Sequence, residues 1–232
     1  MLSLITGVGA RGQVGEAVAV ALAQRGDTVL LVSRETAEVH GRARELEASG
    51  FPAHGYGCDL ADASAVSRLA DQIRSEHGRK LDALVNLAGG FAASGPLTES
   101  DPAAFERMLR INYTTAYLTT RAFLPDLVAA RGSIVFFASD AVLEGARAGG
   151  IGAYVAAKSA VVALMRSVAD EGRPMGVRAN ALAPGSIRTT TNEASMGSDT
   201  RYVERADVAS TVMFLCSPEA RAITGQVIRL RA

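Results

Sequence analysis

Residues 154–158 read Tyr-Val-Ala-Ala-Lys, and this spacing places an acid–base side chain beside a cation. Positions four residues apart share one face of a helix, so the phenol of Tyr154 and the ammonium of Lys158 would be neighbours there. A phenol titrates near a pKa of about 10, and a nearby positive charge favours its ionised form. The pair is suited to proton transfer near neutral pH. A surface helix can carry the same spacing by chance, so the rest of the chain must decide.

The bulk composition is that of an ordinary globular protein. The chain has 232 residues, 48% of them hydrophobic, and its 24 basic and 24 acidic side chains give a net charge of zero. That length suits a single α/β domain with a large core, spanning residues 1–232. The balanced charge gives no pull toward nucleic acid or an anionic membrane. No secretory signal and no apolar run of about 20 residues is evident, so we expect a cytoplasmic protein without a membrane span.

The cysteines and histidines offer no metal or disulfide framework. Cys58 and Cys216 stand alone, and the three histidines, at positions 40, 54 and 77, lack the spacing of a zinc site. We therefore expect no metal and a reducing compartment.

Short apolar runs alternate with longer helical stretches along the whole chain. Strands are predicted at 2–6, 28–33, 53–59, 83–88, 133–139, 177–183 and 225–230. Helices are predicted at 14–26, 35–49, 63–77, 103–129, 153–171 and 207–217. This alternation predicts a doubly wound parallel sheet covered by helices on both faces. Ligands of such sheets bind beyond the carboxyl ends of the strands, so the informative residues should follow each strand.

The first two strands are followed by residues suited to a phosphate. The loop TGVGARGQVG (6–15) contains Gly7, Gly12 and Gly15 and leads through Val14 into an apolar helix whose N-terminus attracts anions. After the second strand, where a dinucleotide-binding fold often has an acid for the ribose of NAD, this chain has Ser33 and Arg34. Together with Arg11, these residues favour a 2′-phosphate and hence NADP over NAD, unless both arginines are merely solvated surface groups.

The remaining strands also end in candidate site residues. After the third strand, Asp59 and Leu60 could flank an adenine, and after the fourth, the small residues Asn86, Ala88 and Gly89 let a cofactor approach. The fifth strand is followed by Ser139, and the sixth by a Pro-Gly turn with Pro184, Gly185, Ile187 and Thr189. Each alone fits an ordinary loop. Together they lie along one edge of one sheet.

These motifs, in this order, resemble the short-chain dehydrogenase/reductase family. The resemblance covers Thr6 to about Val227 and includes the TG…G…G loop, CDL, NLAG, IN at 111–112, the serine ending the fifth strand, YxxxK and NALAPG. It implies a Rossmann fold and an NAD(P)-dependent carbonyl or alcohol oxidoreductase.

The resemblance also implies a catalytic group of four residues. Tyr154 would exchange the proton with the substrate oxygen, and Lys158 would lower the pKa of Tyr154 and hold the nicotinamide ribose. Ser139 would bind the substrate oxygen, and Asn112 would anchor a water that links Lys158 to solvent. Relatives pack the helices expected at 103–129 and 153–171 against a second subunit, so we expect a homodimer or homotetramer.

The chain departs from the family pattern in several places. The glycine loop is about two residues longer than usual, Ser139 and Tyr154 lie 15 positions apart, and the substrate lid, at about 189–205, is short. The alternative hypothesis is an NADP-binding sensor with little catalytic activity, but the complete catalytic group argues against it.

The substrate itself is not specified by the sequence. The candidate pocket residues are mainly apolar, with two arginines as possible anchors: Phe91, Val142, Leu143, Gly150, Ile187, Met196, Arg147 and Arg188. A pocket of this kind suits a small or medium carbonyl compound.

Overall fold

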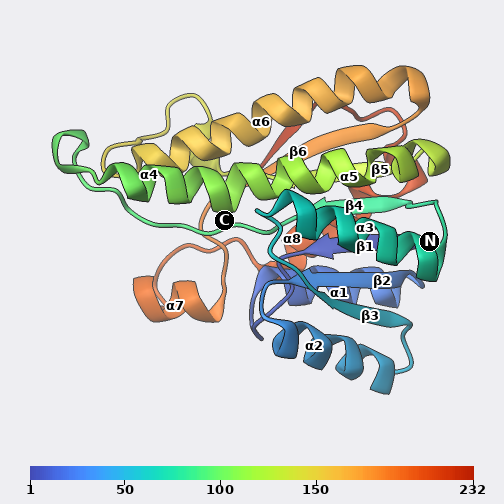
Figure 1. The fold of residues 1–232 in the computed structure, drawn as a ribbon. Coiled ribbons are helices and arrows are strands. Elements are labelled where there is room, and N and C mark those ends of the chain that lie inside the picture. Colours follow the sequence, from blue (N-terminus) through green and yellow to red (C-terminus); the bar gives the residue numbers. More distant parts are fainter.

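A computed structural model describes all residues, 1–232, as one seven-stranded parallel sheet with helices on both faces (Figure 1). The strand order is β3-β2-β1-β4-β5-β6-β7, so the chain starts near the middle of the sheet and winds outward in both directions. The strands are β1 (Leu2–Thr6), β2 (Thr28–Ser33), β3 (Ala53–Gly57), β4 (Ala83–Asn86), β5 (Ser133–Phe137), β6 (Arg178–Pro184) and β7 (Val227–Leu230). The seven predicted strands and the doubly wound topology are confirmed.

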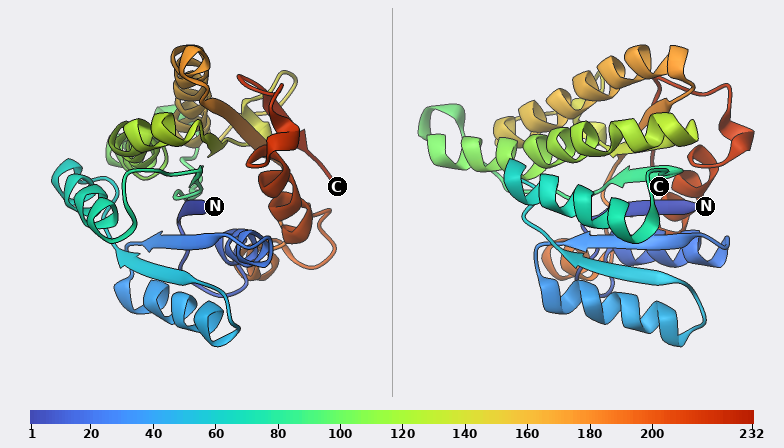
Figure 2. Two further views of the ribbon diagram at one scale, coloured as in Figure 1. Left: turned by 90° about the vertical axis from the view of Figure 1, so that its right-hand side faces the viewer. Right: turned by 45° about the vertical axis from the view of Figure 1, so that its right-hand side comes forward.

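Two apolar layers hold the helices against the sheet, one on each face. The first contains 27 buried residues and joins the sheet to α3 (Ala63–His77), α5 (Thr115–Ala130) and α6 (Gly152–Gly172). The second contains 25 and joins it to α1 (Val14–Gln24), α2 (Thr36–Ala48) and α8 (Arg205–Leu215). Figure 2 shows these helices enclosing the sheet. Because both faces are covered, the central strands are nearly continuous apolar runs, as in SIVFF of β5.

The predicted helix at 103–129 is interrupted in the structure. It begins as α4 (Pro102–Leu109), passes through a π-helical turn (Arg110–Thr114) and continues as α5. Such π turns widen a helix locally and are frequent at functional sites. Asn112 lies in this turn and is buried, so the interruption coincides with a predicted catalytic residue.

The predicted lid contains a short helix that the sequence analysis did not anticipate. This helix, α7 (Thr190–Met196), projects beyond the carboxyl ends of the strands, on the left of Figure 1. Its N-terminus is capped by Thr189, whose hydroxyl accepts a hydrogen bond from the backbone of Asn192. Short 3₁₀ turns complete the connections, at Leu97–Glu99, Asp140–Val142, Arg173–Met175 and Pro218–Ala220.

Helix α6, together with the turn that follows it, is long and apolar enough to cross a membrane by length and composition alone. The expectation concerned an uninterrupted apolar run, and α6 is interrupted by Lys158 and Arg166. In the fold, however, α6 contributes Val161, Met165 and Val168 to the core beneath the sheet. Its apolar character is explained by this packing.

Candidate active site

A cleft of about 400 Å³ lies at the carboxyl ends of the central strands. Three of the four predicted catalytic side chains, Ser139, Tyr154 and Lys158, line it. Five of the predicted cofactor-binding residues line it as well: Val14, Gly89, Pro184, Gly185 and Ile187. The structure therefore brings together residues from the glycine loop, β4, β5, α6 and β6, which are far apart in the sequence.

Lys158 is buried, and its ammonium group donates a hydrogen bond to the backbone oxygen of Phe137 at 2.8 Å. Its Nζ lies 5.9 Å from the centre of the Tyr154 ring, so the two side chains share one face of α6, as the spacing predicted. Burial lowers the pKa of Lys158 to about 8. The group still carries its proton at neutral pH, but it holds that proton much less tightly than a lysine in water.

Tyr154 is mostly enclosed and packs edge-to-face against Phe91, with ring centres 5.1 Å apart. Burial raises the pKa of Tyr154, hydrogen bonding with Ser139 lowers it, and the charge of Asp140 raises it. Burial is the largest of these causes and sets the direction, and the lowering of this pKa by Lys158 stays a prediction. Tyr154 is therefore a neutral phenol at physiological pH, the form that donates a proton.

Ser139 follows β5 by two residues and is 8% exposed. Its hydroxyl accepts a hydrogen bond from the backbone of Ala141 at 3.3 Å and so caps the 3₁₀ turn Asp140–Val142. Despite the longer loop to Tyr154, Ser139 lines the same cleft as the phenol.

Asn112 fixes the loop after β4 instead of lining the cleft. Its side-chain amide donates to the backbone oxygens of Gly90 and Met108, and its Oδ1 accepts from the backbone of Gly90 at 3.1 Å. A Cβ on Gly89 would lie 2.5 Å from that oxygen and 3.4 Å from Nζ of Lys158. Only glycine fits between these two side chains, and the π turn is the element that brings Asn112 this close.

The glycine loop forms a tight cradle at the start of α1. Gly7 has a φ of +77°, and a Cβ on Gly15 would lie 2.5 Å from the backbone oxygen of Gly7. Helix α1 has no side-chain cap at Gln13, so its first backbone N–H groups are available to an anion. A close backbone approach beside an uncapped helix N-terminus fits the pyrophosphate of a dinucleotide.

The lid contacts the longer glycine loop directly. The side-chain amide of Gln13 donates to the hydroxyls of Thr190 at 2.7 Å and Thr191 at 3.0 Å. The backbone N–H of Thr190 donates to the oxygen of Gly12 at 3.2 Å, and a Cβ on Gly12 would lie 2.4 Å from the Thr190 side chain. The additional loop residues thus connect α7 to the start of α1.

The two arginines that are predicted to bind a 2′-phosphate have acidic partners. Arg11 pairs with Glu45, and Arg34 pairs with Glu35 at 3.3 Å, both as exposed ion pairs. Such pairs are weak, so each guanidinium remains available to a phosphate.

An acid that the sequence analysis missed also lies near this point. A Cβ on Gly9 would lie 2.8 Å from Oε2 of Glu38 and 3.2 Å from Oγ of Ser33. Glu38 follows the strand by five residues, in the first turn of α2. A carboxylate here would accept a hydrogen bond from a ribose hydroxyl but would repel a 2′-phosphate.

Other predicted cofactor residues do not line the cleft. Asp59 is exposed and pairs with Arg110 at 2.9 Å, whereas Leu60 is buried. Asn86 is buried, and its Oδ1 has no hydrogen-bond partner. The backbone of Ala88 donates to the hydroxyl of Thr6 at 3.0 Å, which fixes the small-residue turn beside the glycine loop.

Of the predicted substrate-pocket residues, Phe91, Ile187 and Met196 line the cleft. The others do not: Val142 and Leu143 pack against the core, Gly150 binds the loop at Ser94, Arg147 is exposed, and Arg188 pairs with Glu193 and Glu204. Lining residues that the sequence analysis missed include Asp140 and Asn192. Asp140 directly follows the predicted serine, which was the available signal.

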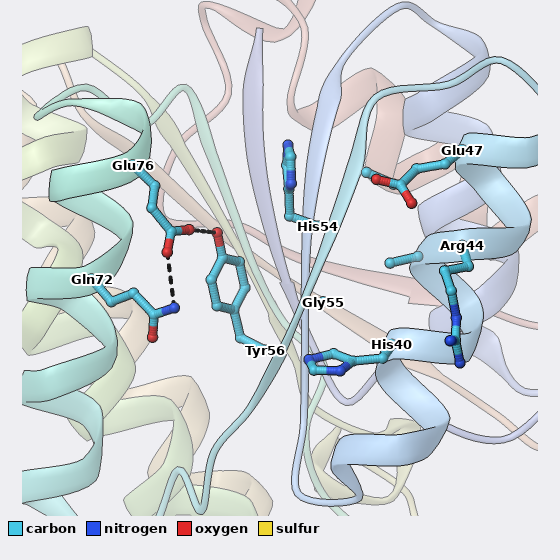
Figure 3. Close-up of a pocket in the computed structure, with 10 residues that line it drawn as sticks. His40, Arg44, Glu47, His54, Gly55, Tyr56, Gln72 and Glu76 are labelled. Carbon is cyan, nitrogen blue, oxygen red and sulfur yellow. Dashed lines mark hydrogen bonds between the residues drawn. The ribbon is translucent and has the colours of Figure 1, made fainter.

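A second pocket, of about 350 Å³, lies beside the edge strand β3 (Figure 3). Its walls are α2, with His40 and Arg44, and α3, with Gln72 and Glu76. The phenol of Tyr56 donates a hydrogen bond to Glu76 at 2.6 Å. None of the predicted catalytic or cofactor residues lines this pocket, so the cleft is the candidate active site. No group of three or more His, Cys, Asp or Glu side chains is arranged to hold a metal ion.

Comparisons with known proteins agree with this geometry. A family model described as enoyl-(acyl carrier protein) reductase matches residues 7–230. The chain is 33% identical over 238 residues to 2-(S)-hydroxypropyl-CoM dehydrogenase 3 of Xanthobacter autotrophicus, a match covering 95% of this chain and 91% of the relative.

Solved structures show the same fold. One is gluconate 5-dehydrogenase of Burkholderia cenocepacia in complex with NADP and tartrate, with a TM-score of 0.90, 27% identity and coverage of 99% of this chain and 93% of that one. Another is NAD⁺-bound xylitol dehydrogenase, with a TM-score of 0.89, 26% identity and coverage of 99% and 97%. Members with either nicotinamide cofactor are therefore similar to this chain.

Proposed function

This chain belongs to the short-chain dehydrogenase/reductase family of NAD(P)-dependent oxidoreductases, and we propose that it interconverts a small or medium carbonyl compound and its alcohol with Tyr154 as the acid–base group. The proposal is carried by the cleft in which Ser139, Tyr154 and Lys158 converge beside the glycine cradle.

The bound nicotinamide supplies the hydride. In reduction, Tyr154 gives its proton to the carbonyl oxygen, and in oxidation it takes the proton from the alcohol. Ser139 donates a hydrogen bond to the same oxygen and stabilises the negative charge that develops on it. Lys158 places a positive charge 5.9 Å from the centre of the Tyr154 ring, which stabilises the phenolate that is left in reduction and that takes the proton in oxidation. Asn112 holds the loop that positions Gly89 between Asn112 itself and Lys158.

The test is oxidation of NADPH, followed by absorbance, with a panel of carbonyl compounds. The panel includes diketones, β-ketoacyl thioesters, steroid ketones and sugars. We expect Tyr154→Phe to lose at least about a thousandfold in kcat while it still binds NADPH, because only the proton donor is removed. Equal turnover by wild type and Tyr154→Phe would refute the assigned role. NADPH binding without any turnover in the wild type would favour the alternative, a cofactor-binding sensor.

We further propose a preference for NADP over NAD. Arg11 lies in the glycine loop and Arg34 directly follows Ser33, and an adenosine ribose binds at these two loops in this fold. The ion pairs of both arginines are exposed, so both guanidinium groups are available to a phosphate. Glu38 opposes the preference, because its carboxylate lies close to Ser33. The balance is measured by titrating the protein with NADPH and NADH, and equal affinities would contradict the proposal.

A homodimer or homotetramer in the cytoplasm completes the proposal. Phe105 of α4 and Tyr117 of α5 are large apolar side chains that are more than 40% exposed, at 43% and 41% respectively. Their burial against a second copy would remove apolar surface from water. Light scattering measures the mass in solution, and a monomer would refute this part.

A further inference from the structure

The cleft contains one charged side chain that the proposed chemistry does not use. Asp140 and Lys158 are the only charged residues that line it, and the remaining lining residues are apolar or neutral. Asp140 directly follows Ser139, and its side chain is 28% exposed. Because Ser139 and Asp140 line the same cleft, we take the carboxylate to lie near a substrate group one or two carbons from an oxygen bound by Ser139.

One carboxylate oxygen of Asp140 is occupied from the far side. Oδ2 lies 3.7 Å from Arg229 and 3.6 Å from Arg231, two residues of the C-terminal segment. Neither arginine lines the cleft. A Cβ on Gly185, which lines the cleft, would lie 3.8 Å from the same oxygen, so Oδ2 lies between the cleft wall and the C-terminal arginines. The other oxygen, Oδ1, takes part in no side-chain hydrogen bond or ion pair within the protein.

An ionised carboxylate with a free oxygen is a hydrogen-bond acceptor and cannot donate. It attracts a hydroxyl group through a charge-assisted hydrogen bond and forms none with a second carboxylate, which is also only an acceptor. The two guanidinium groups behind it offset its charge at longer range. This offset acts on the attraction of an ammonium ion and on the repulsion of a carboxylate alike, so the selection rests on hydrogen bonding: a neutral hydroxyl donates to the free oxygen, whereas a carboxylate has no proton to donate.

We propose that Asp140 is a specificity-determining residue that selects substrates with a neutral hydroxyl next to the reacting centre. The substrates would then be hydroxy ketones and vicinal diols, and α-keto or α-hydroxy carboxylates would be rejected. This inference rests on the proposed function, since Ser139 and Tyr154 define where the reacting oxygen lies. The apolar lining near Phe91 and Met196 accommodates the rest of the substrate.

Three ligands that share a phenyl carbinol test this selection by binding alone. They are 1-phenylethanol, 1-phenyl-1,2-ethanediol and mandelate, which differ only in carrying a methyl, a hydroxymethyl or a carboxylate group. Dissociation constants are measured by ligand-observed NMR on the protein with and without NADPH. For the wild type we expect the diol to bind at least about tenfold more tightly than 1-phenylethanol, and mandelate to bind most weakly.

In Asp140→Ala the diol should lose its advantage, to within about twofold, and mandelate should gain affinity. Asp140→Asn keeps the volume of the side chain and removes only the charge, so it should also bind mandelate more tightly than the wild type does. This variant replaces Asp140→Ala in the test if the alanine variant fails to fold. Asp170→Ala, an exposed aspartate near the end of α6, is the matched control and should keep the wild-type ranking.

Equal affinities for the diol and 1-phenylethanol in the wild type, or no measurable binding of the diol, would overturn the proposal. A ranking that survives Asp140→Ala would do the same. Turnover of acetophenone with NADPH is a separate readout. If it is absent while the ligand ranking holds, the proposed reaction fails and the selective site remains.

Discussion

The burial of Lys158 has a measurable consequence for stability, which the variant Lys158→Met isolates. Lys158 is 6% exposed, and its pKa falls from 10.5 to about 8. Each tenfold change in proton affinity corresponds to about 1.4 kcal/mol, so the charged side chain costs the folded state about 3 kcal/mol at pH 7. Methionine has a similar volume and carries no charge.

The dependence on pH separates this cost from other effects of the substitution. Loss of the hydrogen bond to Phe137 leaves a buried carbonyl without its partner, which costs about 1–3 kcal/mol at every pH. The protonation cost changes with pH, because between about 8 and 10.5 the unfolded chain binds more protons at this site than the folded one. The free energy of unfolding therefore rises with pH between about 8 and 10.5, and the destabilisation by the buried charge is fully present below about pH 8.

The assay is urea denaturation at fixed protein concentration, followed by tyrosine fluorescence and circular dichroism, since the chain has no tryptophan. We expect the free energy of unfolding of the wild type, relative to Lys158→Met, to increase by about 2 kcal/mol between about pH 7 and pH 9.5. Lys80, the only other lysine, is exposed, so Lys80→Met is the matched control. A constant difference between wild type and Lys158→Met over this range would refute a buried, charged lysine.

Three further predictions concern the lid, the end of β2 and the glycine cradle. Gln13→Ala removes two hydrogen bonds to threonine hydroxyls of α7, so release of NADPH should be about tenfold faster by stopped-flow, and an unchanged rate would show that the lid does not retain the cofactor. Arg34→Ala should weaken NADPH by at least about tenfold and NADH by less than about threefold; equal losses in parallel titrations would contradict a role at the 2′-phosphate. Gly15→Ala places a methyl group 2.5 Å from the backbone oxygen of Gly7 and should lower the free energy of unfolding by about 1–3 kcal/mol, whereas Gly41→Ala, with no atom within 4 Å, should not lower it.

The sequence alone determined the fold and the placement of Tyr154 and Lys158 as a neighbouring group on one helix. Alternating apolar runs and helical stretches specify a parallel sheet, because buried strands must be apolar on both faces. The four-residue spacing of Tyr154 and Lys158 specifies one face of a helix, because that relation depends only on helix geometry. Both are local or periodic properties of the chain.

Only the tertiary structure decided what surrounds that group. The contact between Gln13 and Thr190 joins residues 177 positions apart, and no local pattern encodes it. The position of Glu38 near Ser33 depends on how α2 packs, and the free oxygen of Asp140 depends on where the C-terminal arginines lie. The high pKa of Tyr154 and the low pKa of Lys158 arise mainly from burial, and burial is set by the assembled fold and not by spacing along the chain.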